Sequence, residues 1–322
     1  MGKIQVGSAI AENGKRGNGF LDIASTPDGF PVRTPVIVLN GSKPGPKLWV
    51  QGCIHGNEYC GALGILQVCR EVNPAELSGT LIGFPSLNVT GFLEERRFSP
   101  YSYFGVPDLN RVFPGKANGN FTEIMAYHIF NALVQNANYF IDFHCGHNPD
   151  TYWTLYNEDG SETAKKSCEL AKAFGIDLIY PSTSEILKNG MFVQATKHQI
   201  PGIIVEAGGA GELVTTEAVT TVSEGIKSVM KYLKMLDQPF SWKENYVLFK
   251  DWTWMLAPHG GRFVPAVKPR DRLKIGQIIA RVYTIFEEEL EPVRSTVDGI
   301  VLTISRKPFV VAGDSIIQIG IP

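Results

Sequence analysis

Three residues of the sequence have the side chains and the spacing of a zinc site. His55 and Glu58 lie three positions apart, directly after the apolar run 48–54, and His144 ends the apolar run 139–144 much further along the chain. Imidazole nitrogens and carboxylate oxygens are zinc ligands, and three protein ligands leave a fourth position for water or substrate. The pattern therefore predicts one catalytic zinc ion per chain and, with it, a hydrolase.

Asp142 and Glu206 are carboxylates that we expect near these ligands. Asp142 lies two residues before His144, so on a strand both side chains share a face and Asp142 is able to orient a ligand imidazole. The alternative is a buried Asp142 paired with another local donor. Glu206 ends the apolar run 202–206 and precedes Ala-Gly-Gly, where it fits a general base that activates the attacking water. Capping of a neighbouring helix is the alternative for Glu206.

Two segments carry arginines suited to an anionic substrate. The segment 108–115 places Asn110 beside Arg111, and a guanidinium recognises a carboxylate in a bidentate manner while the amide adds a donor. The segment 93–98 contains two adjacent arginines. Without other evidence, a local ion pair in a surface loop explains Arg111, and a solvated charge run explains the second segment.

The composition indicates a globular protein without general affinity for polyanions. The 322 residues are 44% hydrophobic, enough for a large core and two domains. The formal charge of −2 gives no electrostatic reason to expect nucleic-acid or membrane partners, and five cysteines without a CxxC pair indicate neither a disulfide framework nor a thiolate zinc cluster. No signal-like or membrane-spanning apolar run is found, so we expect a cytoplasmic location, with homo-oligomerisation left open.

The chain is expected to form an α/β domain followed by a β-rich domain. Short β-branched runs alternate with amphipathic stretches between about residues 36 and 208, which predicts helices packed on a mostly parallel or mixed sheet. Strands are predicted at 36–39, 48–54, 80–84, 139–144 and 202–206, and helices at 59–72, 122–136, 163–174 and 215–236, with Thr122 as the N-cap of the second helix. After residue 239, Gly, Pro and Asp interrupt short apolar runs, so we divide the chain into a catalytic domain over 1–245 and a β-rich domain over 246–322.

Taken together, these motifs resemble the succinylglutamate desuccinylase/aspartoacylase family, a branch of the zinc-carboxypeptidase fold. The resemblance covers about residues 30–210 by motif and the remainder by domain layout. It implies that His55, Glu58 and His144 bind zinc and that Glu206, in Val-Glu-Ala-Gly-Gly, is the catalytic carboxylate.

The same resemblance implies roles for the polar segments and for the tail. Asn110 and Arg111 match the clamp for the substrate carboxylate, and Arg97, with Arg96 as a competing match, corresponds to an arginine that assists at the substrate carbonyl or carboxylate. The tail is similar to the barrel-sandwich module of family members, but it lacks the Met-Lys-Met turn that carries biotin or lipoate. His147 and His259 are left as structural or rim residues because the ligand set is complete without them.

The function expected from the sequence is a zinc-dependent amidohydrolase that removes an acyl group from an N-acyl amino acid or a similar small amide bearing a carboxylate. The alternatives are a zinc carboxypeptidase acting on peptides and a non-enzymatic metal-bound small-molecule sensor. Glu206 argues against the sensor, because a sensor needs no proton shuttle. Residues 246–322 are expected to limit access to the site and to shape substrate choice.

Overall fold

A mixed sheet of nine strands forms the centre of the molecule. The computed structural model describes residues 2–146, 148 and 150–322. The order across the sheet is β11-β9-β8-β10-β7-β5-β6-β4-β3. The strands are β3 (Lys15–Ser25), β4 (Pro31–Asn40), β5 (Lys43–Gln51), β6 (Ser78–Phe84), β7 (Tyr139–Gly146), β8 (Tyr152–Asn157), β9 (Leu178–Ser182), β10 (Gly202–Gly209) and β11 (Val247–Leu248). The inner strands β10, β7, β5 and β6 run parallel, and β8 and β4 run antiparallel to their inner neighbours.

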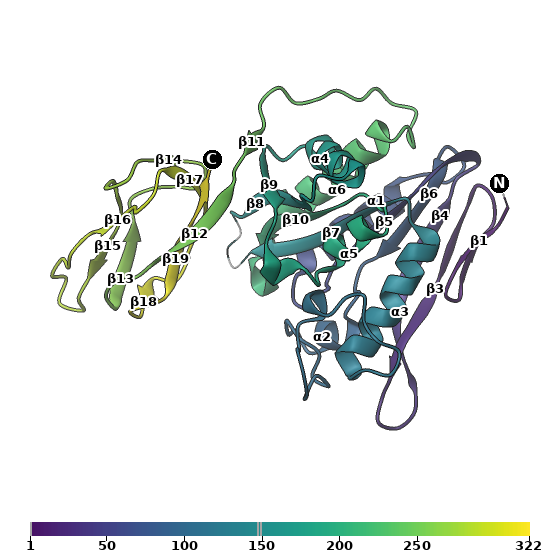
Figure 1. The fold of residues 1–322 in the computed structure, drawn as a ribbon, viewed down its shortest axis with the longest axis horizontal. Coiled ribbons are helices and arrows are strands. Elements are labelled where there is room, and N and C mark those ends of the chain that lie inside the picture. The colour runs from purple at the N-terminus through teal and green to yellow at the C-terminus, as the bar shows by residue number, and fades with distance from the viewer. Residues whose placement is uncertain (1, 147, 149) are drawn as a thin grey trace.

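Helices cover both faces of this sheet (Figure 1). On one face α1 (Tyr59–Glu71), α4 (Glu162–Phe174) and α6 (Thr216–Tyr232) pack on apolar side chains that include Ile141 and Phe143 of β7. On the other face α3 (Phe121–Asn136) and α5 (Met191–Lys197) pack on side chains that include Phe140. Because side chains alternate along a strand, Asp142 and His144 lie on the same face as Phe140.

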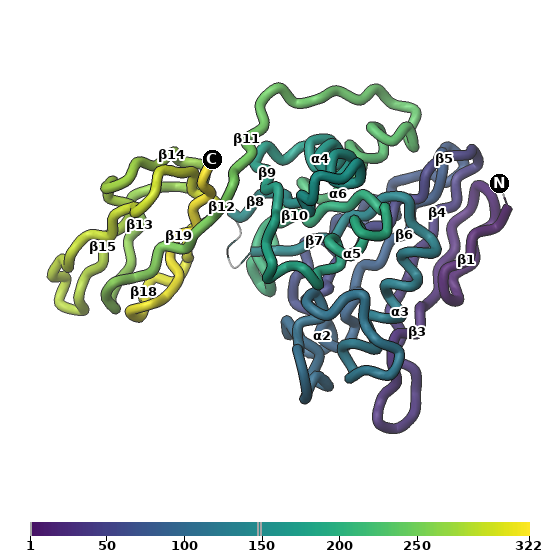
Figure 2. Tube along the Cα trace, viewed as in Figure 1, coloured from purple at the N-terminus to yellow at the C-terminus, as the bar shows by residue number. Residues whose placement is uncertain are grey.

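The C-terminal part of the chain is an all-β domain with its own apolar core. One antiparallel sheet has the order β12-β19-β17-β14 and the other has the order β16-β15-β13-β18. Their strands are β12 (Asp251–Leu256), β13 (Gly261–Pro265), β14 (Arg272–Leu273), β15 (Ile278–Tyr283), β16 (Val293–Arg294), β17 (Gly299–Ile304), β18 (Phe309–Val310) and β19 (Ser315–Ile321). The tube trace in Figure 2 shows this domain as a separate lobe beside β8 and β9. At the other end of the chain, β1 (Ile4–Val6) and β2 (Ala9–Ala11) form a small hairpin.

The predicted fold class is confirmed, since helices flank a mixed sheet and an all-β domain follows. The division at residue 245 stays a prediction; Val247–Leu248 still pair with β9 in the large sheet, and β12 begins at Asp251. Among the described helices, none combines the length and the apolar character needed to cross a membrane.

Several predicted element boundaries were wrong. The N-cap of α3 is Asn120 and not Thr122, because Asn120 forms a reciprocal capping box with Glu123. The strand expected over 48–54 ends at Gln51, and Cys53 then adopts a left-handed backbone with φ of 54°. The strands β3, β8 and β9 and the helix α5 were not predicted at all.

Candidate metal centre and active site

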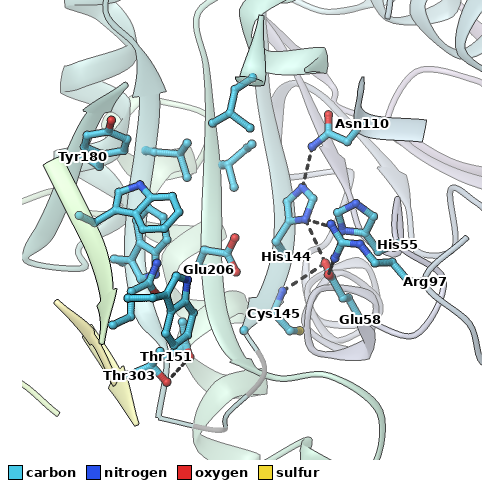
Figure 3. Close-up of a pocket in the computed structure, with 18 of the residues that line it drawn as sticks. His55, Glu58, Arg97, Asn110, His144, Cys145, Thr151, Tyr180, Glu206 and Thr303 are labelled. Atoms are coloured by element: carbon cyan, nitrogen blue, oxygen red, sulfur yellow. Dashed lines mark hydrogen bonds and ion pairs between the residues drawn. The ribbon is translucent and has the colours of Figure 1, made fainter. Parts of the chain in front are cut away.

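His55 and Glu58 lie in the tight connection between β5 and α1. Gly56 packs against the short helix α2 (Val89–Leu93) so closely that an added Cβ would lie 2.1 Å from the carbonyl carbon of Gly91, which explains a glycine directly after His55. Glu58 precedes the first residue of α1, yet its side chain makes no capping hydrogen bond to the helix. Its carboxylate is turned instead toward the two histidines (Figure 3).

The structure brings the three predicted ligands together. Donor atoms of His55, Glu58 and His144 all lie within 4.8 Å of one another, and the three side chains are buried. His55 Nδ1 is 2.9 Å from Glu58 Oε1, His144 Nδ1 is 3.0 Å from Glu58 Oε2, and the two Nδ1 atoms are 3.1 Å apart. Ligand atoms of a tetrahedral zinc site stand roughly 3.3 Å apart when each lies about 2.0–2.1 Å from the metal. The three side chains therefore converge at nearly the spacing that zinc requires.

The outer nitrogens of both rings determine which nitrogen is available for a metal. His55 Nε2 lies 3.0 Å from Asp108 Oδ1, and His144 Nε2 lies 3.1 Å from Asp142 Oδ2. A carboxylate only accepts hydrogen bonds, so each Nε2 carries the proton that it donates to its carboxylate, and a ring that loses its second proton then presents the lone pair of Nδ1 inward. Two lone pairs and a carboxylate that face one point repel each other unless a cation lies between them, so this donor set fits zinc.

Charge coupling within the cluster shifts the pKa values of its members. Burial opposes ionisation of Glu58, but the His55 and His144 rings outweigh it and hold the pKa of Glu58 far below its usual range. Burial likewise opposes the charged form of His144, and the Asp142 and Glu58 carboxylates reverse this, so the pKa of His144 is well above its usual value. Without a metal ion, bound protons thus supply the positive charge that balances the carboxylates of this cluster.

Glu206 lies beside the ligand cluster on the neighbouring strand. In the parallel pairing of β10 with β7, Glu206 is the register partner of His144. Its carboxylate points across the pocket toward the ligand cluster (Figure 3). Burial raises the pKa of Glu206 to about 7, with the charge of Glu58 adding to the increase and His144 opposing it. A carboxylate that titrates near neutral pH is suited to general acid–base chemistry.

Arg97 faces the pocket, whereas its neighbour Arg96 is exposed and does not line it. Arg97 Nη1 lies 3.1 Å from Glu58 Oε1, and Nη2 lies 3.3 Å from Asp108 Oδ2. Of the two competing arginines, only Arg97 is therefore within reach of a substrate at the cluster.

Asn110 and Arg111 belong to a 3₁₀ turn (Leu109–Arg111) that also lines the pocket. The Asn110 side chain is buried; its Oδ1 accepts a hydrogen bond from the Met191 backbone N–H, and its Nδ2 lies 3.2 Å from His144 Nε2. The Arg111 guanidinium donates to the Asn110 carbonyl and stands 4.0 Å from Asp108. Of the remaining histidines, His259 is exposed and does not line the pocket, and His147 lies outside the described residues.

Several residues of the site were missed by the sequence reasoning. Asp108 contacts His55, Arg97 and Arg111, although only its neighbours in the same segment were singled out. Gln51 donates to Asp142 from inside β5. The alternation of Trp252 and Trp254, both of which line the pocket, was a readable signal, since residues two apart on a strand share a face.

Comparison with known proteins identifies the family of this chain. Residues 44–233 match the sequence model of the succinylglutamate desuccinylase/aspartoacylase catalytic domain. The chain belongs to this family. A curated relative, the N-alpha-acetyl-L-2,4-diaminobutyric acid deacetylase of Halomonas elongata, is 25% identical over 298 residues, covering 90% of this chain and 86% of the relative.

Solved structures share the fold over nearly the whole chain. A succinylglutamate desuccinylase from Silicibacter sp. TM1040 superposes with a TM-score of 0.81 at 21% identity, covering 95% of this chain and 94% of the other. The product-bound ectoine utilization protein EutE (DoeB) from Ruegeria pomeroyi superposes with a TM-score of 0.80 at 22% identity, again covering 95% and 94%. The match thus extends through the C-terminal domain of this family member.

Proposed function

We propose that this family member is a zinc-dependent amidohydrolase that removes the acyl group from an N-acyl amino acid. The observation that carries the proposal is the pairing of Glu206 with His144 on adjacent strands, beside a ligand set whose Nδ1 atoms converge. A sensor has no use for a carboxylate with a pKa of about 7 next to its metal, but a hydrolase needs such a group. The names of the relatives, a deacetylase and a desuccinylase, support an acyl group on nitrogen.

The ligand set is His55 and His144 through Nδ1, and Glu58 through its carboxylate. Zinc held there supplies the positive charge that polarises the scissile carbonyl and acidifies water. Asp108 and Asp142 keep the two rings in the tautomer that this binding needs.

The remaining residues act directly on the substrate and the attacking water. Glu206 accepts a proton from the water as it attacks the amide carbon and then donates that proton to the departing amine. Arg97 donates to the oxygen on which negative charge develops, and Arg111 with Asn110 holds the carboxylate of the amino acid. Each of these side chains lines the same pocket as the ligand set.

The proposal is tested with the full-length protein. The protein is stripped with a chelator, divided into metal-free and zinc-reloaded samples, and assayed for amine release from a panel of N-acetyl amino acids and from short unmodified peptides. We expect turnover of N-acyl amino acids only after zinc is restored. Turnover of the peptides alone would identify a carboxypeptidase, and stoichiometric zinc binding without any turnover would identify a non-enzymatic metal protein.

A further inference from the structure

The pocket continues past Glu206, away from the metal ligands, over an apolar stretch of the sheet. In the antiparallel pairing of β10 with β8, Trp153 is the register partner of Glu206. His144, Glu206 and Trp153 therefore form one row across three neighbouring strands, with side chains on one face. In the adjacent row, Ile204 of β10 is followed by Leu155 of β8 and Tyr180 of β9, and these three side chains also line the pocket.

The C-terminal domain also contributes to the lining of the pocket. Trp252 and Trp254 of β12 line the pocket together with Thr303 of β17 and Gln318 of β19. The Thr303 hydroxyl lies 3.0 Å from the hydroxyl of Thr151 at the start of β8, so the two domains are joined at the edge of the pocket. We use "aromatic wall" below for Trp153, Tyr180, Trp252 and Trp254.

Charges in the pocket are confined to the side that holds the metal ligands. The charged or metal-ligating side chains among the described lining residues are His55, Glu58, Arg97, Arg111, His144 and Glu206. Both guanidinium groups lie near Asp108, and Arg97 is paired with Glu58 as well, so Arg111 has the fewer partners and is the better placed of the two for a substrate carboxylate. The aromatic wall itself offers neither a cation for a second carboxylate nor a carboxylate for an ammonium group.

Trp153 has features that a simple core residue does not need. It is 7% exposed and packs edge-on against Phe249, with ring centroids 5.8 Å apart. Its indole N–H has no hydrogen-bond acceptor among the described residues, and an unpaired buried donor destabilises a fold. A phenylalanine would pack here without that cost. The indole of Trp153 thus serves both the core, where it packs on Phe249 and Tyr180, and the lining of the pocket.

From these observations we infer that the aromatic wall selects substrates with a single carboxylate and an uncharged apolar group, above all an aromatic ring. This inference rests on the proposed deacylase function and names its substrate class. The apolar group enters either as the amino-acid side chain, as in N-acetyl-L-phenylalanine, or as the acyl group, as in N-benzoylglycine. A second carboxylate on the substrate would have to be desolvated against indole and aliphatic side chains without a cation beside it. An ammonium group would find only the faces of the aromatic rings in place of a carboxylate, and that attraction is smaller than the cost of desolvating the charge.

The inference is tested by kcat/KM values of the zinc-loaded full-length protein. N-acetyl-L-phenylalanine and N-benzoylglycine are compared with N-acetyl-L-aspartate and Nα-acetyl-L-2,4-diaminobutyrate. We expect at least one phenyl substrate to exceed both charged substrates by about tenfold or more, since apolar contacts discriminate on this scale. The faster of the two phenyl substrates shows whether the amino-acid side chain or the acyl group of the substrate contacts the aromatic wall. A charged substrate that matches or exceeds both phenyl substrates overturns the inference and leaves the deacylase function standing.

Two variants test whether the aromatic wall is responsible for the selectivity between substrates. Trp254 is only partly buried, so Trp254→Arg should fold, and we expect it to raise the kcat/KM ratio of N-acetyl-L-aspartate to the better phenyl substrate by about tenfold. Trp242→Arg is the matched control, because Trp242 packs on Phe240 and Tyr232 and does not line the pocket. An unchanged ratio in Trp254→Arg, or an equal change in the control, overturns the assignment.

If no N-acyl amino acid is hydrolysed, a binding measurement still tests whether the aromatic wall is an apolar subsite. In that case the proposed function fails, and 3-phenylpropionate and succinate are titrated calorimetrically into the zinc-loaded protein. The phenyl ligand should bind about tenfold or more tightly than succinate. Equal affinities, or tighter binding of succinate, would show that the aromatic wall is not an apolar subsite.

Discussion

Asp108 links His55 to Arg97 through its two carboxylate oxygens, with Oδ1 3.0 Å from His55 Nε2 and Oδ2 3.3 Å from Arg97 Nη2. One side chain therefore contacts both a candidate metal ligand and the arginine that faces the pocket. Burial raises the pKa of Asp108, but the His55 hydrogen bond, the His55 charge and the arginines outweigh it, so Asp108 is ionised throughout the neutral range.

We expect Asp108→Asn to weaken zinc binding by about 10–100-fold, because loss of an outer partner of a ligand histidine has that effect. Competition with a zinc chelator of known affinity measures it. Asp22→Asn is the control, since Asp22 forms an exposed ion pair with Arg33 and does not line the pocket in the described part of the chain. Equal zinc affinity in both variants would mean that Asp108 does not orient His55.

His144→Ala should remove stoichiometric zinc, because two ligands do not hold a catalytic zinc ion that needs three. Elemental analysis of the purified variant measures the metal content, and circular dichroism checks the fold. His128→Ala serves as control, since His128 is exposed on α3. Full zinc content in a folded His144→Ala protein would show that the ligand set is wrong.

Glu206→Gln should keep zinc and lower kcat by about 10²–10⁴-fold, the usual effect of losing a general acid–base group. Zinc content and kcat are measured on the same sample, so that loss of metal and loss of proton transfer are separated. Glu212→Gln, an exposed change in the connection after β10, is expected to behave as the unmodified protein. A kcat near normal in Glu206→Gln would move the proton shuttle to another residue.

The pH profile of kcat/KM should have an acidic limb that belongs to Glu206. The base works only as the carboxylate, so activity falls as pH drops below its pKa, and burial places that pKa at about 7 in the metal-free site. Bound zinc favours the carboxylate, so the midpoint of the active enzyme lies at or below this value. The residual activity of Glu206→Gln should lack the limb. An identical limb in both proteins would assign it to another group.

A chain that ends at Gln238 should still bind zinc but show altered relative rates across substrates, because it lacks the two tryptophans of β12 and the pocket-lining residues Thr303 of β17 and Gln318 of β19. It also loses Phe249, Ile300 and Leu302, which share an apolar cluster with the large sheet, so it is expected to associate more readily. Relative kcat/KM values are compared for the monomeric fraction. Unchanged ratios there would leave stabilisation as the role of the domain.

Much of the metal centre could be predicted because its residues stand at the ends of apolar runs. Strand residues two apart share a face, which linked Asp142 to His144, and a glutamate after the run 202–206 was expected at the same edge of the sheet. These inferences need only local patterns. The structure brings His55, Glu58, His144 and Glu206 into one pocket, and Asp142 contacts His144 from behind it.

The aromatic part of the pocket was not predictable in the same way. Trp153 faces Glu206 only because β8 pairs antiparallel with β10, and the short strand β8 had not been identified. Trp252 and Trp254 reach the pocket only because the C-terminal domain docks beside β8, through contacts such as Thr151 with Thr303. The order of strand pairing and the docking of the domain depend on contacts between distant segments. The spacing of residues within a short stretch of sequence does not predict such contacts.

The contact of Thr151 with Thr303 forms only after the candidate metal ligands have been synthesised, because Thr303 follows them in the sequence. The residues of the candidate metal centre are complete in the chain once Glu206 has been made, whereas Gln318 lies within the last strand. At about 5–20 residues per second, the ribosome takes on the order of ten seconds to add the intervening segment. During that interval the nascent chain carries its candidate metal ligands without the complete C-terminal domain that brings Trp252 and Trp254 to the pocket. Under the proposed function, substrate selectivity is therefore acquired after the metal ligands, and we expect it to be lost when the C-terminal domain is removed.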